Sequence, residues 1–277
     1  MRNIELKCSY SVPSEGNDLT VRQLEHLARL LLYRRLTPAD IKVRMLLHCL
    51  GARLRHSYIG RRVLLCIGRE SWPVDAPTMT DLSGAMDFLV RDAGKGRTVC
   101  DPMLTKQPYP TIKAGGRELH GATDNLFSLT FGQYMYLLTY MDAASGDSMS
   151  LAHALSCVWT SGSRFDIDRA DGDAEHIRRL PLERQTVMYW FVSGSLSALA
   201  DQFPRLYAPA SADGSVSRRM GGNVLDHQLR LLDALAGGDM TKKDQVRDGL
   251  LMDALYTMDE RVRQHEEQEQ KLNKKKS

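Results

Sequence analysis

The sequence contains few cysteines, and they are scattered along the chain. Five occur among 277 residues, no two closer than about 17 residues, so no Cys-x-x-Cys pair exists. Without such pairs the chain has neither a zinc-ribbon nor a dithiol redox motif, and we interpret the cysteines as reduced core thiols of a cytoplasmic protein. They are Cys8, Cys49, Cys66, Cys100 and Cys157.

Long apolar runs are also missing. The longest, over residues 187–200, is interrupted by Ser193, Gly194, Ser195 and Ser197, and it is too short and too polar to cross a bilayer. The first seven residues carry charges where a secretion signal requires an apolar segment. We therefore expect no membrane association and a protein that stays in the cell where it is made.

Charge of one sign is not in excess. The formal net charge is +3, with 37 Lys and Arg against 34 Asp and Glu. A nucleic-acid partner normally requires a basic patch or stripe. Here the net charge is small and Lys and Arg alternate with Asp and Glu, so we do not expect a nucleic-acid partner.

Catalytic motifs fail at defining positions. Gly94-Lys95-Gly96 lacks both the preceding glycine and the following Ser or Thr of a P-loop, and it predicts a helix-ending turn. Gly162-Ser163 and Gly194-Ser195 lack the trailing glycine of a nucleophile elbow. The eight histidines form no His-x-x-x-His pair. We therefore expect no enzyme, cofactor or metal site.

One acidic segment leaves an alternative open. It contains Asp166, Asp168, Asp171 and Asp173. An EF-hand register through Gly172 would place residues that cannot ligate calcium at its first, third and twelfth positions. The segment predicts a solvated polar loop, 161–173, with helix-capping Asp. A weak cation site, serving a metal-dependent enzyme on nucleotides or nucleic acid, is the less favoured alternative.

Two matching helix starts lie 110 residues apart. Leu19-Thr20-Val21-Arg22-Gln23 and Leu129-Thr130-Phe131-Gly132-Gln133 each pair a capping Thr with a Gln three positions later, which is the pattern of a capping box. A second helix follows at the same spacing, from Thr37-Pro38 and from Asp147-Ser148. The spacing predicts two related helical units.

The remaining pattern predicts small β elements and further helices. We expect strands at 4–10, 62–68 and 71–74, and a hairpin over 109–120 with Gly115-Gly116 as a two-residue turn. A third helix is expected from Thr80 or Asp81 through Leu89, ended by Gly94 and Gly96. A long buried helix is expected over 182–203, ended by Pro204. Further helices are expected over 224–236 and from Lys242 or Gly249 onward, with a fraying helix or disordered tail beyond Val262.

The predicted fold class is therefore mainly α (α+β). It has two related helical units, small β-hairpin elements and a C-terminal helical extension. The predicted organisation is an N-terminal α+β unit (1–120), a second helical unit (121–207), a linker (208–222), and C-terminal helices with a charged tail (223–277).

Aromatic residues concentrate in the second unit. We assign most of them to the core, with a partner-binding groove as the alternative, because aromatics are enriched at interface centres. The candidate partner-binding residues are Tyr134, Tyr136, Tyr140, Trp159, Tyr189 and Trp190.

The strand followed by a helix opening with Leu-Thr-x-x-Gln, together with the stretches 126–138 and 250–263, resembles tail assembly chaperones or small tail-morphogenesis proteins of phages and prophages from Bacteroidetes-type genomes. The resemblance implies a non-enzymatic protein in the cytoplasm of a bacterial host cell. It would bind helical segments of a long tail protein, such as the tape measure, during assembly. The main alternative is a structural connector or tail subunit of the virion, which could form a homo-oligomer.

Overall fold

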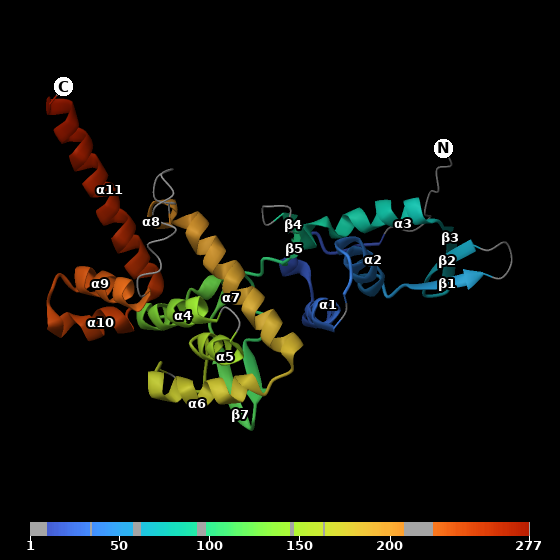
Figure 1. The fold of residues 1–277 in the computed structure, drawn as a ribbon, viewed down its shortest axis with the longest axis horizontal. Helices are drawn as coiled ribbons and strands as arrows, with labels where there is room; N and C mark the ends of the chain where they lie inside the picture. Colours follow the sequence, from blue (N-terminus) through green and yellow to red (C-terminus); the bar gives the residue numbers. More distant parts are fainter. Residues whose placement is uncertain are drawn as a thin grey trace. The chain divides into compact units, whose positions relative to one another are not determined.

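The computed structural model describes residues 10–33, 35–57, 62–92, 98–144, 147–162, 164–207 and 224–276. The chain divides into two compact units (Figure 1): residues 1–104 with 182–190 form unit 1, and residues 105–181 with 191–277 form unit 2. Both units combine helices with small antiparallel sheets, so the predicted mainly helical α+β class is confirmed. The predicted strand 4–10, except for Tyr10, and the predicted linker 208–222 lie outside the described residues.

Unit 1 begins with a helix pair and continues into a sheet. Its elements are η1 (Gly16–Asp18), α1 (Val21–Tyr33), α2 (Pro38–Cys49), β1 (Arg53–Ser57), β2 (Arg62–Ile67), β3 (Glu70–Val74), α3 (Ala76–Ser83), η2 (Gly84–Leu89), β4 (Val90–Asp92), β5 (Thr98–Cys100) and the first part of α7 (Leu182–Gln202). Strands β1, β2 and β3 form one antiparallel sheet, and β4 and β5 form another.

The core of unit 1 includes one face of each helix of its first pair. Leu24, Leu27 and Ala28 of α1 are buried, as are Ile41 and Met45 of α2. These residues recur at helical spacing, so one stripe of each helix is removed from water. The pattern located both helices, but Leu32, at the same helical spacing, is 43% exposed and Leu30 is buried instead.

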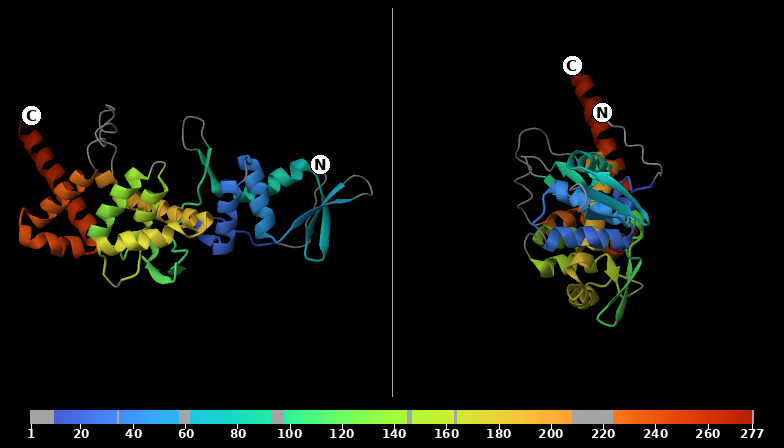
Figure 2. Two further views of the ribbon diagram at one scale, coloured as in Figure 1. Left: turned by 60° about the horizontal axis from the view of Figure 1, so that its bottom comes forward. Right: turned by 90° about the vertical axis from the view of Figure 1, so that its right-hand side faces the viewer.

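Unit 2 contains a hairpin, a second helix pair and the C-terminal helices. Its elements are β6 (Thr111–Ala114), β7 (Arg117–Gly121), η3 (Asp124–Leu126), α4 (Phe131–Ala143), α5 (Ser148–Ser156), β8 (Trp159–Thr160), α6 (Ile167–Arg178), the second part of α7, α8 (Pro204–Tyr207), α9 (Val224–Ala236), η5 (Met240–Lys242), α10 (Lys243–Asp248) and α11 (Leu251–Lys276). Helix α5 packs between α4 and α6 (Figure 2), and α9 and α10 pack on α4.

The duplicated helix starts are confirmed by their hydrogen bonds. The Thr20 amide donates to Gln23 Oε1 at 2.8 Å, and the Thr130 amide donates to Gln133 Oε1 at 2.9 Å. In return each Gln amide donates to the Thr hydroxyl, which completes a capping box. Helices α1 and α4 consequently begin and end at positions 110 residues apart.

The predicted two-residue hairpin turn is confirmed as well. Ala114 pairs with Arg117 across the turn, and Gly115 and Gly116 both have positive φ, at 55° and 85°. Positive φ at both central residues is the requirement of a type I′ turn, which glycine meets without a steric penalty. The turn packs against α6, where His176 lies next to Gly115.

Other predicted elements require correction. The third helix begins at Ala76, earlier than predicted, because the Asp75 carboxylate accepts the Thr78 amide and caps it. The predicted polar loop 161–173 is wrong beyond Asp166, since α6 starts at Ile167. Pro204 begins the short helix α8 after α7 has ended at Gln202. Strand β1 was missed because Arg-Leu-Arg-His-Ser offers one apolar residue and no alternation.

The C-terminal region is mostly helical in its described residues. Gly249 interrupts it, because the backbone there is extended and pairs with the start of α4: the Phe131 amide donates to the Gly249 carbonyl and the Leu251 amide donates to the Leu129 carbonyl. Beyond that point α11 continues to Lys276 and projects from α9 and α10 (Figure 1). Within the described ranges, no helix has the length and apolar character needed to cross a membrane.

The predicted boundary at residue 120 falls at the end of β7, inside unit 2. The structural division comes earlier, after Leu104, and it also passes through α7 between Trp190 and Phe191. Because one continuous helix contributes to both units, the amino-acid composition does not change at the point of division. Local sequence therefore gives no signal for it.

Candidate functional site

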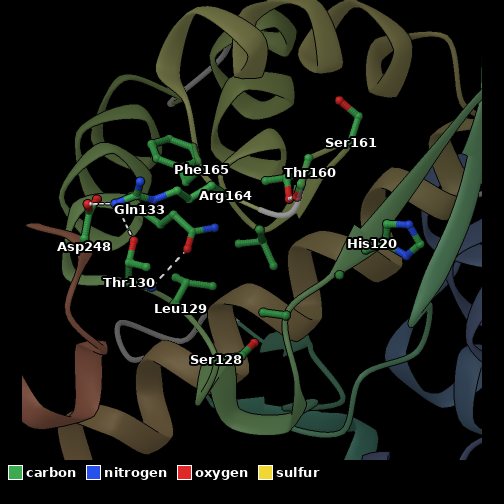
Figure 3. A pocket seen from close by; sticks show the side chains of 14 residues that line it. His120, Ser128, Leu129, Thr130, Gln133, Thr160, Ser161, Arg164, Phe165 and Asp248 are labelled. Atoms are coloured by element: carbon green, nitrogen blue, oxygen red, sulfur yellow. Dashed lines mark hydrogen bonds and ion pairs between the residues drawn. The ribbon is translucent and has the colours of Figure 1, made fainter.

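A pocket of about 510 Å³ opens in unit 2 where four segments meet. Its lining comes from the end of β7, the start of α4, the segment from Val158 to Phe165, and the end of α10 (Figure 3). Hydroxyl groups dominate the polar part of this lining, and Leu129, Val158 and Phe165 supply most of the apolar part. The hydroxyl residues are Ser128, Thr130, Thr160 and Ser161.

The start of α4 is fixed from three sides. Gln133 Oε1 accepts a hydrogen bond from the Thr130 backbone amide. The Gln133 side-chain N–H donates a hydrogen bond to the Cys157 carbonyl at 2.8 Å, which ties α4 to the end of α5. A Cβ on Gly132 would lie 2.5 Å from Cγ of Arg247, so the absent side chain lets α10 approach α4 closely. The pocket wall is therefore formed by backbone and side chains with little freedom to move.

Two opposite charges meet at the pocket beside the capping box. The Arg164 guanidinium donates to the Asp248 carboxylate, and both side chains are largely exposed, at 81% and 50%. An exposed ion pair contributes little to folding because water screens it and its side chains lose entropy. Both groups can exchange this pairing for charges of a ligand at small cost.

A strip of partly exposed aromatic side chains adjoins the pocket. Tyr136 of α4 lies against Phe165 of the pocket lining, with ring centroids 5.9 Å apart. Tyr140, one turn further along α4, stacks on His153 of α5 at 5.0 Å. We call Tyr136, Tyr140 and Phe165 the aromatic strip. Its three members are neither fully buried nor fully exposed.

His153 holds one end of the strip in place. Its Nδ1 lies 2.9 Å from the Met149 carbonyl oxygen, and its Nε2 lies 3.2 Å from Oδ1 of Asp171 on α6. These two contacts orient the ring face toward Tyr140. Burial, followed by the nearby Asp171 carboxylate, raises the pKa of the Tyr140 phenol, which therefore stays neutral at physiological pH.

The other candidate partner residues lie elsewhere. Tyr134 is buried with its hydroxyl hydrogen-bonded to Tyr207, and Trp159 is fully buried with its indole N–H donated to the Tyr109 carbonyl. Tyr189 and Trp190 belong to unit 1, where Trp190 is buried and Tyr189 is 38% exposed. The structure thus brings together Tyr136 and Tyr140 and separates the remaining four from them.

The acidic residues of the predicted cation segment have separate structural contacts. Asp166 caps α6 by accepting the Asp168 amide, and Asp171 pairs with His153. Asp173 is buried, where it accepts the Ser161 amide at 2.8 Å and pairs with Arg117. Within the described ranges, no group of three or more His, Cys, Asp or Glu side chains is placed to hold a metal ion.

Three of the cysteines, Cys49, Cys100 and Cys157, are poor nucleophiles. Burial raises the pKa of the Cys49 thiol to about 11 and also raises the pKa values of the Cys100 and Cys157 thiols. A thiol with a raised pKa is protonated at neutral pH and reacts slowly. Among the described cysteines, only Cys157 is a fully buried core thiol as predicted, because Cys49, Cys66 and Cys100 are partly exposed.

Sequence reasoning missed most of the pocket. Arg164 and Asp248 are 84 residues apart and are joined only by the folding of α10 onto α4. Phe165 was placed in a polar loop. A signal for the pocket existed at Thr130 and Gln133, whose capping box was predicted, although nothing in the sequence linked that box to the end of α5.

Comparison of the chain with known protein families, curated proteins and solved structures found no match.

Proposed function

We propose that this protein is a non-enzymatic morphogenesis factor of a phage or prophage tail. Its task would be to bind helical segments of a long tail protein, the tape measure being the obvious candidate, before assembly. The observation that supports protein binding is the aromatic strip, whose tyrosines and Phe165 lead into an open pocket. The resemblance in the sequence supplies the tail context.

The chemistry of the strip suits a partner helix. Tyr136 and Tyr140 are one turn apart on α4, so they present neighbouring rings along one line of the helix surface. An amphipathic helix places its apolar side chains at the same spacing, and aromatic residues carry much of the binding energy in such interfaces. The hydroxyl groups of the pocket and the exposed Arg164–Asp248 pair would contact polar side chains at the edge of that helix.

The test compares tagged variants in cells that express the native gene cluster. Tyr136→Ser with Tyr140→Ser removes the strip, and Tyr33→Ser with Tyr256→Ser removes two tyrosines that are 60% and 56% exposed elsewhere. Loss of two central aromatic contacts is expected to weaken capture of the tail protein at least about tenfold, whereas the control pair retains it. Both variants are checked for a folded state by circular dichroism.

Equal capture of the long tail protein by the strip variant and the control would overturn the role of the strip. Capture of no tail protein by the wild-type chain would overturn the proposed function itself.

A further inference from the structure

In one stretch of unit 1 every residue that carries a formal charge is basic. From Ile41 to Arg69 the chain has seven Lys or Arg residues and no Asp or Glu. Unit 1 as a whole has 17 Lys and Arg against 12 Asp and Glu, while unit 2 has 20 against 22. The small net charge of the whole chain therefore conceals a basic unit and a slightly acidic one.

The register of the β1–β2–β3 sheet places two of these seven residues, Arg53 and Arg55, on one face. Arg53 pairs with Cys66, and Cys66 pairs with Ser71, so these three residues share a face. Arg55 and its partner Leu64 lie on that same face two residues along. We call Arg53 and Arg55, with the residues that share their face, the basic face.

The opposite face of the sheet is the apolar one. Leu65 is 2% exposed there, and its cross-strand neighbour Trp72 contacts Tyr10 edge-to-face at 6.3 Å. Glu70, the first acidic residue after the basic stretch, pairs with Ile67 on this apolar face. The apolar face is covered at Leu65, although Leu54 at the edge is 42% exposed, whereas Arg53 and Arg55 on the basic face are both exposed.

Three arginines in or beside this sheet, Arg53, Arg55 and Arg69, are exposed. Arg53 and Arg55 lie on the edge strand β1, and Arg69 lies in the β2–β3 turn at the same end of the sheet as Arg53. None of the three forms an ion pair with a carboxylate among the described residues, in contrast to Lys42, which pairs with Asp87 at 2.7 Å. The sheet extends beyond α2 at one end of unit 1 (Figure 1).

We propose that the basic face binds the phosphate backbone of double-stranded nucleic acid without reading its sequence. Arg53 and Arg55 are separated by two strand residues, about 6.6 Å, which places two guanidinium groups along one line of phosphates. Single-strand binding normally uses aromatic side chains on which bases stack. Between the strands the basic face presents Leu64, Cys66 and Ser71, none of which is aromatic, and Trp72 of β3 lies on the opposite face. Because the described residues of this face offer no aromatic ring on which a base could stack, a duplex is the partner that its chemistry fits.

This surface is independent of the aromatic strip, which belongs to unit 2. It also reverses the expectation drawn from the small net charge and from the alternation of basic with acidic residues, because residues 41–69 contain no Asp or Glu and phosphate binding depends on local charge density.

The experiment measures fluorescence anisotropy of a labelled DNA duplex with the purified full-length chain, in salt from about 50 to 200 mM. The expected result is weak binding, with a dissociation constant of about 10⁻⁴ to 10⁻⁶ M at physiological salt. Arg53→Gln with Arg55→Gln should reduce the slope of log K against log salt by about 2. The matched control, Arg230→Gln with Lys271→Gln, removes two exposed charges from unit 2 and should leave the slope unchanged.

Three results would overturn the proposal. They are an equal loss of binding in both variants, tighter binding of a single strand of the same sequence than of the duplex, and binding of anionic phosphatidylserine vesicles with no binding of the duplex.

Discussion

Single glycines decide how closely the elements of unit 2 approach each other. A Cβ on Gly132 would meet Arg247, and a Cβ on Gly121 would meet both Gln107 and Trp159. Each glycine lets two segments that are distant in sequence come into contact without a gap, which preserves close packing. The candidate pocket depends on such contacts, because both Gly121 and the start of α4 contribute to its wall.

The hairpin turn provides a direct test of this role. Gly115→Ala places a Cβ 2.1 Å from Nδ1 of His176 at a residue with φ of 55°, so both strain and a clash oppose it. We expect a loss of about 2 to 3 kcal/mol in the free energy of unfolding, measured by urea denaturation. Gly116→Ala is the control, since its φ of 85° imposes strain but no atom lies within 4 Å. Equal losses in the two variants would refute the contact with α6.

At the scale of helices and strands, the sequence predicted the features that are fixed by hydrogen bonds between residues close together in the chain. The capping boxes at Thr20 and Thr130 and the Gly115-Gly116 turn were readable because each depends on residues within a few positions. Strand β1 and helix α6 were missed or misplaced, since their apolar pattern is weak and their stability comes from packing. Helix α6, for example, buries Ala174 and Ile177 against α5 despite its polar sequence.

The same limit applies to the candidate site. Tyr136 and Tyr140 were singled out from the sequence, but Phe165, Arg164 and Asp248 reach them only through tertiary contacts. The sorting of Arg53 and Arg55 onto one face likewise requires the strand register, which no local pattern supplied.

The helix pair of unit 1 should respond to acid. His26 of α1 stacks on His48 of α2 with ring centroids 3.9 Å apart. Burial, followed by the nearby Arg29 guanidinium, lowers the pKa of His48 below 6.5. The folded state therefore favours the neutral ring, and its stability should fall as the pH drops below about 6.5 and level off below the lowered pKa.

Thermal unfolding between about pH 7.5 and pH 5 measures this effect. His48→Gln is expected to reduce the fall in melting temperature, because the ring that resists protonation is absent. The change should be small, since His48 is partly exposed to solvent. An unchanged pH dependence in His48→Gln would show that the stacked pair does not cause it.

At the scale of the whole molecule, one helical design serves two different settings. Helices α1 and α4 start from the same capping box, yet α2 leads into the basic sheet whereas α5 leads through β8 into α6. The duplication thus supplies a framework in each unit, and the segments that follow it supply the surfaces. The two proposed surfaces, the aromatic strip and the basic face, lie in different units and can be removed separately by substitution.

The measurement that tests the central proposal most directly is mass spectrometry of two samples from one culture that expresses the native gene cluster. One sample is the material bound to the tagged chain in cells, and the other is the purified particles. Our account predicts a long, helix-rich tail protein in the first sample and none of this chain in the second. Recovery of the chain in particles at a fixed stoichiometry would instead make it a structural subunit. Absence of any tail protein from both samples would contradict a role in tail assembly.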